Sequence, residues 1–324
     1  MNRYITFSVA LLFVLMISSC TKDTSVLDRR EQELRFFELY VQSNYPEAEL
    51  AQEGLYYFEH KAGTGDMARP EDWLLVNHVG YELPEDQIFV SYIENVVQDH
   101  DLDPNGVALY GPYKMLNGSV NQGLTQGISL MHEGGQATIL FTSPLGYGNN
   151  GNSLVGPYAS LKYEIELLEV IPDIEAYELA KTGAYLDTIA VFETIGDPNS
   201  DAEMYVIIDH DTDGQLITAD SAVSLTYKGQ LLDGRVFDEA DKKNPYVFTQ
   251  GQAEHIPGWD LGLVTLREGE KARLVIPYQL AYGEAGRVER GLQAIPPYET
   301  LLFEIEVLRV GGETDDNGEI PVEE

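Results

Sequence analysis

The chain carries the same series of motifs twice, and this repeat limits the possible folds more than any other feature. Each copy has a strand-like run that leads into a glycine, then a tyrosine-glycine motif, then a run of alternating apolar residues. Such alternation is typical of a strand with one buried face. The repeat predicts two copies of one module. The corresponding segments are 76–80 and 224–229, 145–148 and 280–283, and 161–166 and 301–306.

Helical patterns precede each copy. Apolar residues recur among charged ones over 27–41, and a second helical pattern covers 174–188, so we expect an amphipathic helix at the first and a helix at the second. The length of 324 residues is sufficient for two hydrophobic cores. The chain is therefore expected to form two α+β units.

The second copy combines many aromatic and isoleucine side chains with one carboxylate. They lie in the run Tyr227–Asp238, in 254–259, in 281–283 and in 295–303. Side chains of these types predict a dry, aromatic-lined pocket with a single polar anchor. Taken singly, each ring would more often be an ordinary core residue.

The order and spacing of these motifs resemble the FKBP-type peptidyl-prolyl cis-trans isomerases. The resemblance implies two tandem FKBP-like α+β domains, each an antiparallel sheet wrapped around a short helix. It also implies isomerisation of X–Pro bonds without a cofactor, with proline-containing unfolded or exported polypeptides as substrates and macrolides of the FKBP type as ligands. The alternative is a non-catalytic peptide-binding module or holdase chaperone for envelope proteins.

The resemblance also assigns roles to residues. Asp238 resembles the buried carboxylate beside the pocket, Trp259 its floor, and Tyr282 the hydroxyl that donates to a substrate carbonyl. His255 stands at a rim position that is usually aliphatic. The implied catalytic residues are Tyr227, Phe237, Asp238, Trp259 and Tyr282, and the implied substrate-binding residues are Tyr246, His255, Ile256, Ile295 and Phe303.

The first copy has lost much of this set. About a dozen additional residues also lie in it near 99–105. We interpret this copy as degenerate, with a structural or peptide-holding role. Four of its residues, Val90, Leu124, His78 and Asn121, stand in place of Asp238, Trp259, Tyr227 and Ile256.

The first twenty residues predict export and lipid attachment. Arg3 is followed by a short apolar run over 5–17 and by Ile17-Ser18-Ser19-Cys20, which resembles a bacterial lipobox. Cys20 is the only cysteine, so it has no partner for an intrachain disulfide. We therefore expect a lipid anchor on Cys20 and a place in the bacterial cell envelope, with the outer membrane favoured.

The net charge and the spacing of metal-ligand residues argue against two other classes of protein, those that bind nucleic acids and those that bind metals. The formal charge of −34 argues against a nucleic-acid partner, because phosphates would be repelled. The segment Asp209–Asp220 matches a calcium loop, but its flanks are strand-like and its twelfth residue is Asp rather than Glu. Calcium binding there stays open against a solvated acidic turn. The histidines show no metal spacing, and we expect no metal site.

The expected organisation follows from these patterns. The segments are a lipoprotein signal peptide at 1–19, a tether and amphipathic helix at 20–52, a degenerate FKBP-like domain at 53–171, a linker with a helix at 172–201, an FKBP-type isomerase domain at 202–311 and an acidic disordered tail at 312–324.

Overall fold

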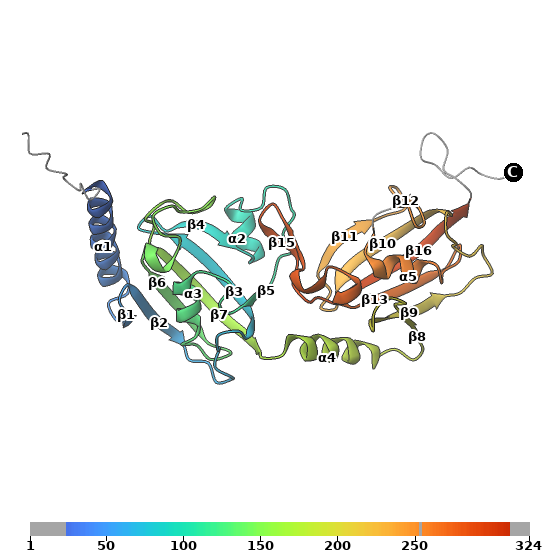
Figure 1. Cartoon of the computed structure of the whole chain (residues 1–324), viewed down its shortest axis with the longest axis horizontal. Helices are drawn as coiled ribbons and strands as arrows, with labels where there is room; N and C mark the ends of the chain where they lie inside the picture. The colour runs from blue at the N-terminus through green and yellow to red at the C-terminus, as the bar shows by residue number, and fades with distance from the viewer. Residues whose placement is uncertain (1–23, 253–254, 312–324) are drawn as a thin grey trace, which may run out of the picture.

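The computed structural model describes residues 24–252 and 255–311. It contains two seven-stranded antiparallel sheets that follow one another along the chain, joined by a helix that bridges them (Figure 1). The predicted signal peptide, Cys20 and the predicted acidic disordered tail lie outside the described residues. Within those residues, no helix is long and apolar enough to span a membrane.

The first domain is preceded by a long helix and has the strand order β1-β2-β6-β7-β3-β4, with β5 paired to β3. Its short helix α3 packs against the sheet and contributes to the core beneath it. Its elements are α1 (Thr24–Asn44), β1 (Glu49–Gln52), β2 (Leu55–Lys61), β3 (Trp73–Glu82), β4 (Gln87–Ser91), α2 (Glu94–Asp99), β5 (Tyr113–Leu116), α3 (Gln122–Ile128), β6 (Gln136–Phe141), η1 (Ser143–Leu145) and β7 (Leu161–Ile171).

The second domain repeats this plan, with the order β11-β10-β16-β13-β9-β8 and β12 paired to β10. A separate two-stranded hairpin, β14–β15, precedes its last strand. The elements from the bridging helix onward are α4 (Ile174–Leu186), β8 (Glu193–Gly196), β9 (Glu203–His210), β10 (Ala222–Leu231), β11 (Val236–Ala240), β12 (Tyr246–Thr249), α5 (Pro257–Leu263), β13 (Lys271–Ile276), η2 (Tyr278–Leu280), η3 (Gly283–Ala285), β14 (Arg287–Glu289), β15 (Leu292–Ile295) and β16 (Leu301–Gly311).

The predicted fold class is confirmed: each domain is an antiparallel sheet with a short helix packed on one face. Two segments that were predicted to lie outside the domains each contribute a strand to a sheet. The predicted linker 172–201 contains β8, whose residues pair with β9, and the predicted tether 20–52 contains β1, whose residues pair with β2. Both strands are short and mostly exposed, so they lack the apolar alternation from which a strand is recognised.

The two copies also agree in strand register. Gly80 pairs with Val90 on β4 and with Tyr163 on β7, and Gly229 pairs with Asp238 on β11 and with Phe303 on β16. A Cβ on Gly229 would come within 2.7 Å of the Phe237 ring. Only glycine lets the flanking aromatic rings approach the strand this closely.

Candidate active site

A cavity of about 430 Å³ opens on the second domain. It lies where β10, β11, β12, α5 and β16 meet, so its walls come from segments far apart in the sequence. Nine of the ten residues assigned from the sequence line it: Tyr227, Phe237, Asp238, Tyr246, His255, Ile256, Trp259, Tyr282 and Phe303.

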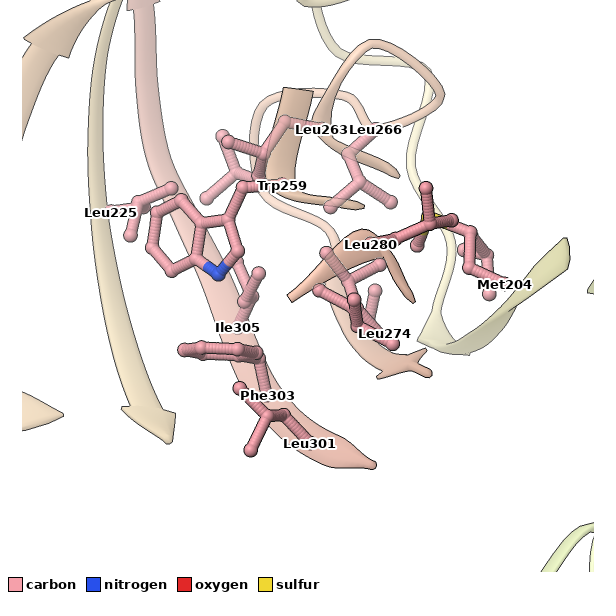
Figure 2. Packing of buried hydrophobic residues seen from close by; sticks show 14 of the residues in the cluster. Met204, Leu225, Trp259, Leu263, Leu266, Leu274, Leu280, Leu301, Phe303 and Ile305 are labelled. Atoms are coloured by element: carbon pink, nitrogen blue, oxygen red, sulfur yellow. The ribbon is translucent and has the colours of Figure 1, made fainter. Parts of the chain in front are cut away.

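The indole of Trp259 belongs both to this cavity and to the core below it. Trp259 is 4% exposed, and Figure 2 shows it pointing from α5 toward Leu225 and Phe303. Its ring centroid lies 5.1 Å from that of Phe303 and 5.2 Å from that of Tyr227, both in edge contacts. A Cβ on Gly258 would come within 2.3 Å of Ile276, so this glycine lets α5 lie close to β13. The helix is thereby held where the indole can form a floor.

The tenth residue, Ile295, does not line the cavity. It ends β15 with only 2% of its surface exposed and lies within the hydrophobic cluster of the second domain. The assignment of Ile295 to the pocket surface is therefore corrected: it packs behind the wall. Sequence spacing places a residue near a site but does not decide which of two apolar layers it joins.

Asp238 is exposed, whereas the resemblance had implied a buried carboxylate, so this expectation is also corrected. It lies on the short edge strand β11, where one face is open to solvent. Its Oδ2 accepts a 2.8 Å hydrogen bond from the Tyr227 hydroxyl, and its Oδ1 accepts one from the Glu239 N–H. Burial and then the bond to Asp238 raise the pKa of Tyr227. The pair therefore presents a neutral phenol beside a carboxylate at the mouth of the cavity.

His255 also lies deeper than the rim position assigned to it. Its side chain is 8% exposed, its Nε2 lies 2.8 Å from the Tyr246 hydroxyl, and its Nδ1 lies 3.5 Å from an Asp260 carboxylate oxygen. Phe248 packs against the His255 ring at 4.7 Å. The sequence interpretation did not include Phe248, although it follows Tyr246 by two residues and so lies on the same face of β12.

The matching site of the first domain is smaller and lacks the polar anchor. Its cavity has a volume of about 150 Å³ and is lined by Val90 and Leu124 among others. His78 is buried in that lining, its Nδ1 has no hydrogen-bond partner, and burial lowers its pKa to about 4. Gly291, from the second domain, also contributes to the lining. This site therefore differs from its counterpart in size, charge and access.

The acidic segment between β9 and β10 has no EF-hand geometry, because strands rather than helices flank it. Its first residue, Asp209, forms a bidentate ion pair with Arg273 at 2.8 Å. Among residues 24–252 and 255–311, no group of three or more His, Cys, Asp or Glu side chains is arranged to hold a metal ion. The described part of the chain therefore offers the aromatic cavity as its best candidate site.

A family model for FKBP-type peptidyl-prolyl cis-trans isomerases matches residues 86–168 and 214–308. These two matches, one in each sheet domain, cover more than half of the chain. The chain therefore belongs to the FKBP-type peptidyl-prolyl cis-trans isomerase family.

Individual relatives match parts of the chain. It is 44% identical over 90 residues to human peptidyl-prolyl cis-trans isomerase FKBP2, which covers 28% of this chain and 61% of the relative. It is 40% identical over 101 residues to FK506-binding protein 3 of Dictyostelium discoideum, covering 31% of this chain and 50% of that one. The solved structure of FkpA from Escherichia coli aligns with a TM-score of 0.34 and 33% identity, covering 42% of this chain and 60% of that one.

Proposed function

We propose that this protein accelerates cis-trans isomerisation of X–Pro bonds in exported polypeptides, and that the cavity of the second domain does so. The observation that carries the proposal is the contrast between the two cavities. The second has an aromatic lining with a carboxylate at its mouth, whereas the first has Val90 and Leu124 at the corresponding positions.

The chemistry needs no nucleophile and no metal. The barrier to rotation about a peptide bond is roughly 18–20 kcal/mol because the C–N bond has partial double-bond character. A catalyst must therefore bind the twisted amide more tightly than either planar form. Water stabilises the charge-separated planar amide, and an aromatic cavity removes that water. A gain of about four decades in rate corresponds to roughly 5–6 kcal/mol of such preferential binding.

The geometry supports a division of roles within the cavity. Trp259 would support the proline ring from below, and Phe237 and Phe303, whose rings are 5.6 Å apart, would form one wall. The Tyr227–Asp238 pair would supply polarity beside the twisted amide. The Tyr282 hydroxyl would donate to a substrate carbonyl. The cavity volume of about 430 Å³ fits a proline and its neighbours and falls within the range of small-ligand pockets.

The competing function is a holdase chaperone that captures apolar segments without turnover. The isomerase and the holdase differ in what they require of the Tyr227–Asp238 pair. Isomerisation needs a polar group beside the amide, whereas capture needs only an apolar surface. A proline-limited refolding assay on the full chain separates them, with the Asp238→Val/Trp259→Leu double variant as comparison. We expect the wild type to accelerate the slow refolding phase and the variant to lose most of that acceleration. A variant with undiminished acceleration would show that this cavity is not the catalytic one.

We also propose that the protein is held in the bacterial cell envelope by lipid on Cys20, with the outer membrane favoured. The short apolar run and the Ser18-Ser19-Cys20 sequence support this. The protein would then act on unfolded or newly exported chains that pass the membrane. The same cavity would accept macrolide ligands of the FKBP type, since such molecules compete for the space that a proline occupies.

A further inference from the structure

One segment of the first domain, residues 109–114, contacts two segments of the second domain that adjoin residues of the candidate active site. It follows α2 and ends in β5. Figure 1 shows the β14–β15 hairpin between the two sheets, beside β5 and α2. The segment begins after the additional residues near 99–105, and its strand β5 has a counterpart in β12 of the second domain.

The hairpin is held by three hydrogen bonds that centre on Gln293. Leu109 N–H donates to the Gln293 carbonyl at 3.0 Å. Gln293 N–H donates to the Tyr92 hydroxyl at 2.9 Å, and its side-chain Nε2 donates to the Lys114 carbonyl at 3.2 Å. Gln293 is 8% exposed, so these bonds are shielded from water. The hairpin spans Arg287–Ile295, and the short turn η3 connects it to Tyr282, which lines the cavity.

The second loop, between β10 and β11, is held by Arg235. Its guanidinium Nη1 donates to the carbonyls of Tyr110 at 3.4 Å and Pro112 at 3.3 Å. Arg235 precedes Phe237 and Asp238 by two and three residues. Residues 109–114 therefore contact the hairpin that follows Tyr282 and the loop that precedes Phe237 and Asp238.

Apolar packing and buried charge strengthen these contacts. The Leu109 side chain is 8% exposed and belongs to the hydrophobic cluster of the second domain, although it comes from the first. The Lys114 ammonium lies 2.8 Å from a Glu178 oxygen and 2.5 Å from a Glu299 oxygen, and it also donates to the Pro297 carbonyl. These three charged side chains are each only 2% exposed. A buried ion cluster of this kind fixes relative position, because any displacement leaves a charge unpaired.

We propose that Tyr92, Leu109, Tyr110, Pro112 and Lys114 are positioning residues for the second domain's cavity: through them the degenerate domain clamps the β14–β15 hairpin and the β10–β11 loop in the shape that receives proline. This inference rests on the proposed function. A loop that is already ordered does not lose conformational freedom when the substrate binds, so the clamp raises affinity. The first copy, although degenerate, thus has a use, because it supplies these contacts.

Tyr92→Phe in the full chain tests the clamp with the loss of one oxygen atom. It leaves the Gln293 N–H without its acceptor and preserves the ring stacking with Tyr113 at 4.7 Å. Tyr113→Phe is the matched control, because Tyr113 is a stacked neighbour in the same domain. Arg235→Gln serves as a second variant, on the β10–β11 loop. The Arg235 side chain is partly exposed. The readouts are amide hydrogen exchange at 287–295, KM and kcat for a proline tetrapeptide by NMR exchange, and its Kd by calorimetry.

We expect Tyr92→Phe to quicken exchange in the hairpin and to raise KM and Kd about fivefold, with kcat unchanged, as befits one lost hydrogen bond. Arg235→Gln should raise KM in the same direction, and Tyr113→Phe should change neither quantity. Two results would overturn the positioning role but leave the proposed isomerase function intact. The first is unchanged amide exchange in the hairpin, and the second is faster exchange with unchanged KM and Kd. A wild-type chain that neither turns over nor binds the peptide would instead sink the proposed function and the positioning role with it.

Discussion

The Tyr227 hydroxyl donates a 2.8 Å hydrogen bond to Asp238 Oδ2, across two paired strands of the second domain. The phenol is half-buried and the carboxylate is exposed. This combination keeps a negative charge at the mouth of an aromatic cavity without the desolvation penalty that a buried charge would carry.

Asp238→Val, which introduces the residue found at the corresponding site of the first domain, should lower kcat/KM about tenfold or more, because a hydrogen bond to a charged group is worth about 1.5–3 kcal/mol. Stability should change little, since the side chain is exposed. A protease-coupled isomerisation assay measures the first effect and urea unfolding the second. Glu239→Val, one residue along the same strand, is the control and should retain activity. Equal losses in both variants would mean that edge-strand charge in general, rather than the Tyr227–Asp238 bond, matters.

Trp259→Leu should reduce both turnover and stability, because the indole lines the cavity and also packs in the core. Shortening a buried aromatic side chain costs about 2–4 kcal/mol. Leu263→Ala separates the two effects: Leu263 lies on the same helix, fully buried but away from the cavity lining. We expect Leu263→Ala to lose comparable stability and to keep KM when both proteins are assayed well below their melting temperatures. If KM rose equally in the two variants, stability alone would account for the change in activity.

Stability should fall as the pH drops from about 6.5 toward 4, because burial lowers the pKa of His78 from 6.5 to about 4. The unfolded chain takes up a proton in this window and the folded chain does not, so the folded state is disfavoured by up to roughly 3 kcal/mol. Urea unfolding at pH 7, 5.5 and 4 measures the effect. His78→Phe should flatten this part of the profile, whereas substitution of the exposed His132 should not. An identical pH slope in wild type and His78→Phe would rule His78 out as the cause.

Cys20→Ser should abolish labelling by a radioactive fatty acid and release the chain from the membrane fraction. No electrostatic attraction to anionic headgroups would compensate, because the formal charge is −34. Membrane fractionation and metabolic labelling of both proteins provide the test. Ser19→Ala, which keeps the cysteine, serves as the control. Retention of the Cys20→Ser protein in the membrane would point to an uncleaved leader instead of a lipid anchor.

The sequence predicted what depends on local pattern. The two modules, the helix at 174–186 and the long amphipathic helix follow from periodicity, and the confirmed fold class follows from their repeated order. The resemblance to the FKBP-type family also identified nine residues that the fold brings around one cavity, because their order and spacing match the motifs of that family.

The remaining features depend on packing between segments distant in the chain. The exposure of Asp238 reflects the edge position of β11, and the burial of Ile295 reflects the layer in which β15 lies. Leu109 follows the additional residues near 99–105 and matched no motif in the sequence, yet its side chain joins the core of the other domain. No periodicity within 99–112 could reveal that, since the partner is almost two hundred residues away.

The buried ion cluster joins three parts of the chain: Lys114 of the first domain, Glu178 and Lys181 of α4, and Glu299 of the second domain. Loss of one partner from such a cluster is strongly destabilising, by about 3–5 kcal/mol, because it leaves a buried charge unpaired. Unfolding of either domain therefore removes one member of the cluster and weakens the pairing of the buried charges that remain.

This coupling has a consequence for how the molecule denatures. Two domains of similar size would ordinarily melt in two steps, but here Leu109 of the first domain joins the core of the second and Lys114 joins the buried ion cluster, so we expect the two domains to unfold as one cooperative unit. Of the chain's two tryptophans, Trp259 lies in the core of the second domain, whereas Trp73 lies on β3 of the first domain and makes an edge contact with Tyr298 of the second. In calorimetry and in single-tryptophan fluorescence we expect coincident transitions for the wild type, and separated ones for Lys114→Met. Coincident transitions would show that the two domains share a single melting equilibrium.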